Sequence, residues 1–124
     1  MSDQRVLFVD DNVLCAFETC EALRGCGYDV MEVHRADDAL QVIDSHFHLS
    51  ALVTDVDLGP GVDGFDVARA ARQIDARLPV VYISGAAAGR HPGEGVDGSL
   101  FVAKPFYPSQ IAEAVDRAIR REAA

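Results

Sequence analysis

Residues 5–12 read RVLFVDDN, an apolar run that ends at once in two aspartates and an asparagine. Short apolar runs of this kind are typical of strands that are buried on both faces of a parallel sheet. Similar runs follow along the chain at 28–33, 51–54, 79–83 and 100–103. Together with 5–9, they predict a sheet of five strands.

The segments between the predicted strands change to the spacing of amphipathic helices. Apolar residues recur three and four positions apart over 13–23, 36–43, 65–74 and, most clearly, 108–119. Strands that alternate with helices predict a parallel sheet with helices on both faces. We therefore expect an α/β fold, a doubly wound five-stranded parallel sheet in the order 2-1-3-4-5. A single domain would fill residues 1–124, with its core at about 4–122.

Residues 85–99, between the last two predicted strands, do not support a full helix. Five of these fifteen residues are glycine and one is proline, and both residue types are poor helix formers. We therefore expect a weak or missing fourth helix, with a short helical turn at 86–88 followed by irregular chain. A long loop in a compact domain is often functional or mobile.

Length and composition exclude several classes of protein. A chain of 124 residues that is 49% hydrophobic is long enough and apolar enough for a folded domain. No apolar run is long enough to span a bilayer, and no leader sequence for export is recognisable. The net charge of −9 argues against non-specific binding to nucleic acid. The three cysteines are an odd number, so we expect reduced thiols in a cytoplasmic protein.

Polar residues follow four of the five predicted strands. Asp10 and Asp11 follow the first, Asp55 the third, Ser84 the fourth and Lys104 the fifth. In the expected order these four strands are neighbours, and ligands bind outside the carboxyl ends of parallel strands. Three carboxylates, a hydroxyl and an ammonium are therefore expected in one site. Lys104 is also the single lysine of the chain, whose other ten basic residues are arginines.

Three carboxylates held together indicate a cation. Either one carboxyl is protonated or a metal ion enters, and a site with oxygen ligands alone favours Mg²⁺. A carboxylate in this position can act as a nucleophile toward a phosphoryl group and form an aspartyl phosphate. The metal ion, the ammonium and the hydroxyl would then stabilise the charge of the transferred group.

This combination resembles a response regulator receiver domain of two-component signalling, of the single-domain, chemotaxis-regulator-like kind. The resemblance covers residues 4–122. It depends on five elements taken together: Val9-Asp10-Asp11-Asn12, Thr54-Asp55, Asp63-Gly64, Ile83-Ser84-Gly85 and Lys104-Pro105. The resemblance implies a flavodoxin-like fold and a protein that signals by a conformational switch after phosphorylation.

The resemblance also implies a role for each acidic residue. Asp55 would be the phosphoacceptor. Asp11, Asp55 and the backbone carbonyl of Asp57 would bind Mg²⁺, and Asp10 would hold the waters of the metal. The carboxylate of Asp57 adds a fourth acid near the site, for which a solvated loop residue and an effect on phosphate lifetime are equally acceptable interpretations.

Further roles follow for the residues at the last two strands. Lys104 would pair with the phosphoryl oxygens, and its bond to Pro105 resembles the cis peptide bond of the family. Ser84 would bond another phosphoryl oxygen and draw the following loop inward. Phe101 occupies the aromatic switch position, but it lacks a hydroxyl, so an inward-turned ring can only pack. The loop that contains Gly-Pro-Gly at 59–61 is one residue longer than the common pattern.

We therefore expect a phosphoacceptor that receives its phosphoryl group from a phosphohistidine of a sensor histidine kinase or a phosphotransfer protein. It would not be an enzyme beyond its own phosphorylation and slow dephosphorylation. Its output would go to an unidentified downstream protein by direct contact, without nucleic acid or membrane. The start at Met1 and the end soon after the last helix favour a stand-alone regulator. A receiver domain cut from a hybrid kinase is the alternative.

Two other functions stay open. The tripeptide at 55–57 resembles the Asp-x-Asp of haloacid-dehalogenase-type phosphatases, which also use Mg²⁺, a hydroxyl and a lysine. In that family the Asp-x-Asp lies on the first strand and the acidic pair comes late, which is the reverse of the order here. A pseudo-receiver that only binds partners is disfavoured by the complete set of acidic, serine and lysine residues. We expect ordinary surface roles for His34, His46, His48 and His91, and a packing role for Cys15.

Overall fold

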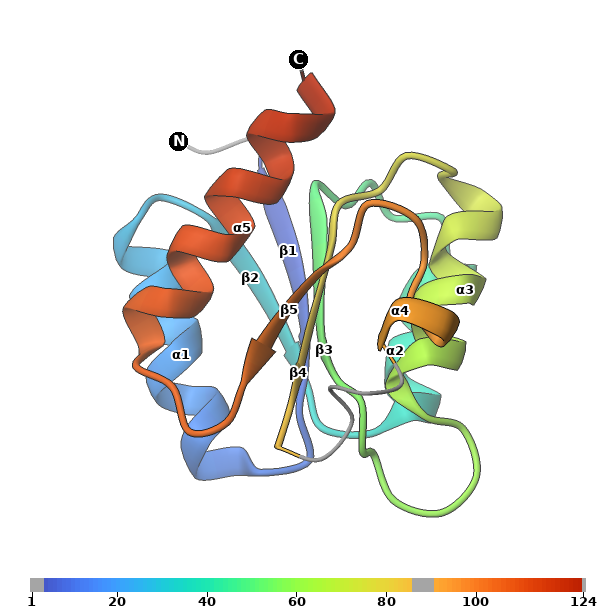
Figure 1. The fold of residues 1–124 in the computed structure, drawn as a ribbon, viewed down its shortest axis with the longest axis horizontal. Coiled ribbons are helices and arrows are strands. Elements are labelled where there is room, and N and C mark those ends of the chain that lie inside the picture. The colour runs from blue at the N-terminus through green and yellow to red at the C-terminus, as the bar shows by residue number, and fades with distance from the viewer. Residues whose placement is uncertain (1–3, 86–90, 124) are drawn as a thin grey trace.

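The computed structural model describes residues 4–85 and 91–123 (Figure 1). Five parallel strands form one sheet in the order β2-β1-β3-β4-β5, which confirms the predicted fold class and strand order. The strands are β1 (Arg5–Val9), β2 (Asp29–Val33), β3 (Ala51–Asp55), β4 (Val80–Ser84) and β5 (Leu100–Ala103). Within the described ranges, no helix has the length and apolar character needed to cross a membrane.

Helices cover both faces of this sheet (Figure 1). α1 (Val13–Gly25) and α5 (Pro108–Ala123) lie together on one face, and α2 (Ala36–Asp44) and α3 (Gly64–Ile74) lie together on the other. Each face has its own apolar core, and β3 and β4 are buried at every position between the two cores. Burial on both faces explains why these strands are continuous apolar runs rather than alternating ones.

Polar side chains begin the two helices that follow the acidic strand ends. The side chain of Asn12 accepts a hydrogen bond from the N–H of Cys15 at 3.2 Å and so caps α1. At α3, Asp63 and Asp66 form a capping box in which each carboxylate accepts from the backbone N–H of the other residue. These caps fix the points at which the chain leaves the sheet edge and enters each helix.

The segment between β4 and β5 contains a helix of only four residues, α4 (His91–Glu94), which confirms the expected weak fourth helix. The turn expected at 86–88 lies outside the described residues. The expectation of irregular chain is wrong for residues 91–94. Pro92 falls in the first turn of this helix, where the missing N–H of proline costs no hydrogen bond.

Residues 94–97, called the strap below, are tied to the rest of the fold through their backbone. Two arginines of α3 donate hydrogen bonds to carbonyls of the strap, and a buried tyrosine of β4 accepts one from an N–H. The bonds are Arg69 Nη2 to Glu94 O (3.0 Å), Arg72 Nη2 to Asp97 O (2.8 Å) and Val96 N to Tyr82 Oη (3.1 Å). They satisfy backbone groups that a longer fourth helix would pair within itself.

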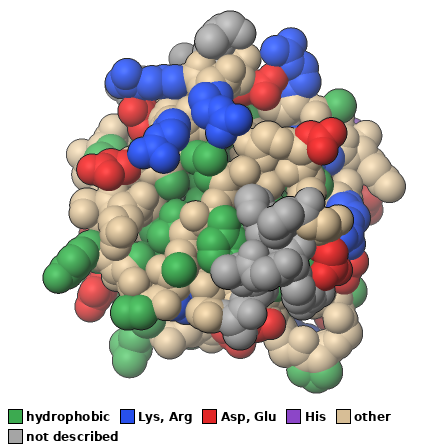
Figure 2. Space-filling model, in the orientation of Figure 1, with side chains coloured by type: hydrophobic (Ala, Val, Ile, Leu, Met, Phe, Trp, Pro, Cys, Tyr) green, Lys and Arg blue, Asp and Glu red, His purple; other side chains and the backbone are tan. Residues whose placement is uncertain are grey.

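β5, the edge strand beside β4, is less covered than β3 and β4. Three of its four residues are half-buried and one is exposed, whereas β3 and β4 are wholly buried. Figure 2 shows apolar side chains in the middle of the face that carries α5 and β5, with Arg side chains gathered near the C-terminus. The C-terminal end of α5 lies opposite the carboxyl ends of the strands (Figure 1), so Arg120 and Arg121 in its last turn lie away from the acidic strand ends.

Gly64, the first residue of α3, lies against the chain that leaves β3. A Cβ atom at this position would lie 2.2 Å from the backbone oxygen of Asp55 and 2.8 Å from Cα of Val56. Both neighbours are backbone atoms, so neither can rotate away. The N–H of Gly64 also donates to the carbonyl of Val56 at 2.8 Å. The absence of a side chain lets α3 start this close to the strand that ends in Asp55.

Gly64→Ala is therefore expected to destabilise the fold by about 2–3 kcal/mol, because the methyl group overpacks a backbone contact. The matched control is Gly25→Ala at the end of α1, where a Cβ atom meets nothing within 4 Å and alanine is the better helix former. Urea unfolding of both variants measures the difference. A Gly64→Ala variant with the wild-type midpoint would contradict the packing argument.

Candidate functional site

Three carboxylates meet where β1 and β3 end. Single oxygens from Asp10, Asp11 and Asp55 all lie within 4.8 Å of one another. Asp10 and Asp55 are 0% and 2% exposed, and Asp11 is exposed. In the sheet, Val9 of β1 pairs with Thr54 of β3, so the next residue of each strand emerges beside the other. The register of two neighbouring strands therefore assembles the acidic cluster that the sequence predicts.

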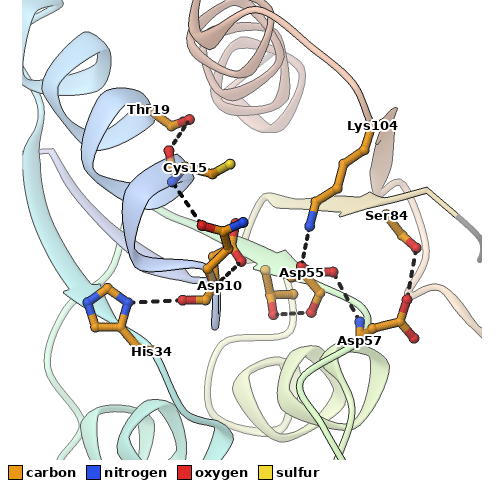
Figure 3. A network of polar contacts seen from close by, with 10 residues as sticks. Asp10, Cys15, Thr19, His34, Asp55, Asp57, Ser84 and Lys104 are labelled. Atoms are coloured by element: carbon orange, nitrogen blue, oxygen red, sulfur yellow. Dashed lines mark hydrogen bonds and ion pairs between the residues drawn. The ribbon is translucent and has the colours of Figure 1, made fainter.

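The ammonium of Lys104 reaches this cluster from the end of β5. Its Nζ donates a hydrogen bond to Oδ2 of Asp55 at 2.6 Å (Figure 3). Burial lowers the pKa of Lys104, but the hydrogen bond to Asp55 and the charge of that carboxylate outweigh burial, and the net pKa is raised. The predicted cis peptide bond between Lys104 and Pro105 is present. Lys104 therefore enters the site as a cation.

The two carboxylate oxygens of Asp10 differ in their surroundings. Oδ1 accepts a hydrogen bond from the N–H of Asn12 at 2.9 Å. Oδ2 is buried and has no hydrogen-bond partner in the part of the chain that the structure describes. Burial raises the pKa of Asp10 to about 6, and Asp55 and Asp11 add to the rise, while the Asn12 N–H and Lys104 oppose it. The negative charge of ionised Asp10 is therefore only partly balanced by the Asn12 N–H and by Lys104.

Asp57 links Asp55 to Ser84. Its N–H donates to Oδ1 of Asp55 at 3.1 Å, and its carboxylate oxygen Oδ2 accepts from the hydroxyl of Ser84 at 3.3 Å. In Figure 3, Lys104 points at Asp55 and Ser84 points at Asp57, from neighbouring strands. Asp57 is exposed, and its carboxylate contacts the buried hydroxyl of Ser84.

His34 lies against the site, although the sequence predicts an ordinary surface role for it. Its Nδ1 lies 3.0 Å from the backbone oxygen of Asp10, and its Nε2 lies 3.2 Å from Oε2 of Glu32. Because a carbonyl oxygen only accepts, Nδ1 carries a hydrogen in this contact. Val33 of β2 pairs with Val9 of β1, which places the two following residues, His34 and Asp10, side by side. The expected strand order makes β1 and β2 neighbours, and the register of the two strands completes the contact between His34 and Asp10.

The remaining candidates take other places in the fold. Phe101 is half-buried in β5 opposite Tyr82 and packs against the apolar core on the α3 face. His46 and His48 are exposed, as expected. All three cysteines are free thiols, which agrees with the prediction. The expected packing role of Cys15 is wrong, because the first turn of α1 leaves its side chain exposed.

The residues present fit a magnesium ion. The three carboxylates of the cluster supply oxygen ligands alone, which is the donor set that Mg²⁺ prefers. Oδ2 of the buried Asp10 is an acceptor that a hydrated cation would satisfy. The like charges that help to raise the pKa of Asp10 would be offset by a divalent cation.

The same arrangement suits the transfer of a phosphoryl group. A carboxylate such as that of Asp55 can attack phosphorus and form an acyl phosphate. The ammonium of Lys104 and the hydroxyl of Ser84 come from the two strands beyond β3, and both are hydrogen-bond donors for anionic oxygens. The edge of the sheet therefore brings together a carboxylate of the type that can act as a nucleophile, candidate metal ligands and two hydrogen-bond donors.

Comparison with known proteins agrees with this chemistry. The sequence matches the family model of the response regulator receiver domain over residues 6–116. The phyllosphere-induced regulator PhyR of Methylorubrum extorquens is 24% identical over 115 residues, which are 92% of this chain and 43% of PhyR. The DNA-binding response regulator MtrA of Mycobacterium tuberculosis is 28% identical over 120 residues, which are 95% of this chain and 51% of MtrA. The chain spans about half the length of these curated relatives.

Solved structures show the same similarity. A response regulator receiver protein from Sinorhizobium medicae has a TM-score of 0.92 and 32% identity, with 96% of both chains covered. The receiver domain of the hybrid histidine kinase CckA has a TM-score of 0.76 and 29% identity, with 93% of this chain and 98% of that domain covered. Because the family model matches most of the sequence, and the sheet order and acidic edge agree with it, the chain belongs to the response regulator receiver domain family.

Proposed function

We propose that this receiver domain accepts a phosphoryl group onto Asp55 from a phosphohistidine of a sensor histidine kinase or a phosphotransfer protein, with Mg²⁺ in the site. The observation that carries the proposal is the setting of the Asp55 carboxylate. It is almost wholly buried beside two further carboxylates, and an ammonium lies 2.6 Å from one of its oxygens. A purely structural ion pair would not need the two further carboxylates, whose repulsion destabilises the fold until a cation joins them.

The transfer would break the P–N bond of the phosphohistidine and form a P–O bond to a carboxylate oxygen of Asp55. The imidazole of the donor leaves with the electron pair, and Asp55 becomes an acyl phosphate. Lys104 and Ser84 bind phosphoryl oxygens, as a charge-assisted donor and a hydroxyl donor. Attack of water on phosphorus later returns the carboxylate and releases inorganic phosphate, so the domain resets itself without an external substrate.

Asp11, Asp55 and the backbone carbonyl of Asp57 would hold Mg²⁺, and Asp10 would hold its waters. When bound, the ion offsets the charge of the carboxylates and of the phosphoryl group. The contribution of the chain is to keep three carboxylates within reach of one ion, although burial and, to a smaller extent, the neighbouring carboxylates raise the pKa of Asp10.

The surface beside the site suits a protein donor. Val13, Leu14 and Phe17 of α1 are 55%, 82% and 59% exposed, and Tyr107 beyond β5 is 78% exposed. Between α1 and the chain after β5 lies a groove of about 380 Å³ whose lining includes Lys104. The donor's phosphohistidine domain would pack on this apolar surface, which lies beside the acidic edge of the sheet.

We further propose that residues 1–124 form one receiver domain, with its core at 4–122, that works in the cytoplasm through protein partners. The net charge of −9 supports protein partners rather than nucleic acid. A downstream protein would recognise the change at Ser84 and Phe101. The half-buried ring of Phe101 packs beside β4, whose last residue is Ser84, so the two are placed to move together.

The phosphatase alternative has no support in the family match. A haloacid-dehalogenase-type phosphatase would use Asp57 as the acid and base partner of Asp55, whereas here the Asp57 carboxylate contacts Ser84. Turnover distinguishes the two functions. A phosphatase hydrolyses p-nitrophenyl phosphate catalytically, and a receiver domain takes up one phosphoryl group.

Incubation with acetyl phosphate and Mg²⁺ is expected to add one phosphoryl group, measured by intact mass. Asp55→Asn is expected to abolish the added mass, because an amide cannot form the acyl phosphate. The matched control is Asp44→Asn at an exposed position of α2, which keeps the added mass. A phosphoryl group that persists in Asp55→Asn would refute the acceptor assignment. If acetyl phosphate adds nothing to the wild type, the same comparison is made with a kinase donor.

Lys104→Arg keeps the charge but is expected to weaken binding of beryllofluoride, a phosphoryl analogue, on the order of tenfold. A guanidinium is a broad planar fork, whereas the ammonium of Lys104 is a point charge 2.6 Å from one carboxylate oxygen. Calorimetric titration in Mg²⁺ measures the affinity, with Arg117→Lys on the exposed face of α5 as the control. Wild-type affinity in Lys104→Arg would remove the reason for a lysine at this position.

The raised pKa of Asp10 predicts a pH-dependent stability that Mg²⁺ counteracts. The folded protein keeps a proton on Asp10 up to about pH 6, above the ordinary aspartate value of 3.8, so the fold gains stability as the pH falls through this window. That stability, at most about 3 kcal/mol, is lost as the pH rises through 6. In EDTA, Tm is therefore expected to fall between about pH 5 and about pH 7. Added Mg²⁺ should raise Tm more at the higher pH.

Asp10→Asn isolates this effect, because an amide does not titrate. The variant is expected to have a flatter Tm–pH profile in EDTA and a smaller response to Mg²⁺, and Asp44→Asn is expected to behave as the wild type. Thermal unfolding followed by circular dichroism gives the profiles. An unchanged slope in Asp10→Asn would show that other groups cause the pH dependence.

A further inference from the structure

Asp57 lies between the two groups that must respond to phosphorylation. Its N–H contacts Oδ1 of Asp55, and its carboxylate accepts the hydrogen bond of Ser84 (Figure 3). Asp55 and Ser84 are 2% and 1% exposed, so an exposed carboxylate here reaches in to a buried hydroxyl. Asp55 pairs with Ile83 in the sheet, and Ser84 is the next residue of β4. One residue therefore bridges the ends of β3 and β4.

The hydroxyl of Ser84 has one hydrogen to donate. In this structure it donates that hydrogen to Oδ2 of Asp57 at 3.3 Å. A phosphoryl group on Asp55 would present strong acceptor oxygens at the same edge of the sheet. Ser84 can donate to one of them only after it leaves Asp57. The carboxylate of Asp57 and the phosphoryl group thus compete for a single hydrogen.

Charge acts in the same direction as this competition. A phosphoryl group brings about two negative charges next to the carboxylate of Asp57. Like charges at short range repel, and Asp10 and Asp11 already make this edge acidic. Asp57 is exposed, so its carboxylate can turn into water at little cost. Phosphorylation of Asp55 therefore favours separation of Asp57 from Ser84.

We propose that Asp57 is a positioning residue whose carboxylate holds Ser84 in the unphosphorylated arrangement, and that phosphorylation releases this hold. The inference rests on the proposed function, because Asp55 must be the acceptor. A contact made in the resting state alone lowers the population of the switched state. Removal of the carboxylate therefore raises that population and tightens the binding of any ligand that requires it.

A double-mutant cycle with Asp57→Ala and Ser84→Ala tests the hold directly. The probe is beryllofluoride at saturating Mg²⁺, with the Mg²⁺ affinity of each variant measured first, since the Asp57 carbonyl is a proposed metal ligand. Asp57→Ala is expected to tighten beryllofluoride binding about fivefold when Ser84 is present, and less than about twofold in the Ser84→Ala background. The same fold-change in both backgrounds would show that charge alone acts and would overturn the proposal.

Asp57→Asn separates the hydrogen bond from the charge, because its amide oxygen can still accept from Ser84. The proposal expects this variant to bind beryllofluoride less tightly than Asp57→Ala does. Equal tightening in the two variants would overturn it.

A readout without ligand keeps the test independent of analogue binding. In ligand-free Asp57→Ala, the amide NMR signals of Ser84 and Gly85 are expected to move part of the way toward their positions in beryllofluoride-bound wild type, while that of Leu7 in β1 stays in place. Signals that stay at the resting positions would overturn the proposal. Wild-type protein that binds no beryllofluoride would contradict the proposed function, whereas binding without coupling between Asp57 and Ser84 would contradict this inference alone.

Discussion

The contact between the ammonium of Lys104 and the carboxylate of Asp55 is the interaction on which the acidic edge depends. It joins the ends of β3 and β5 across β4 and compensates a carboxylate that is almost wholly buried. Asp10 is less well compensated: burial, helped by the neighbouring carboxylates, raises its pKa to about 6, and its Oδ2 lacks a partner among the described residues. An unpaired buried charge opposes folding, so the carboxylate of Asp10 lowers the stability of the folded protein. Locally unfavourable arrangements of this kind are typical of functional sites.

The rest of the fold keeps these charges from moving apart. β1 and β3 are buried on both faces, so neither strand can slide without exposing its apolar side chains. Gly64 lets the start of α3 lie against the backbone of Asp55. Asn12 caps α1 immediately after the acidic pair. Packing therefore prevents the backbone shift that would relieve the repulsion between the carboxylates. Because Asp10 and Asp55 are already buried in place, an incoming cation orders fewer side chains here than in a flexible site.

Local signals in the sequence predicted most of the fold, and the missed contacts depend on long-range geometry. Apolar runs that end in a polar residue located the strands and the acidic cluster, and the glycines of 85–99 predicted a weak α4. The contact of His34 with Asp10 required the register of β1 and β2 as well as their order. The strap could not be predicted, because its acceptors are backbone carbonyls, which any residue type supplies. The bond from Ser84 to Asp57 depends on the rotamer of an exposed side chain, which sequence patterns do not encode.

The structure also gives a reason for the division between arginine and lysine in this chain. Arg72 donates from Nε to the Leu78 carbonyl at 2.7 Å and from Nη2 to the Asp97 carbonyl at 2.8 Å, so one planar fork joins two separate segments. Such a bridge requires donors in fixed directions, which an ammonium lacks. At the acidic edge the proposed function sets the opposite requirement: a compact charge on a flexible stem would contact one oxygen of Asp55 in the resting state and a phosphoryl oxygen after transfer. Lys104 meets this requirement because its three donors rotate about a single nitrogen. The single lysine of the chain therefore stands where the proposed function would have the cation change partners, and the arginines of α3 stand where they join the strap to the fold.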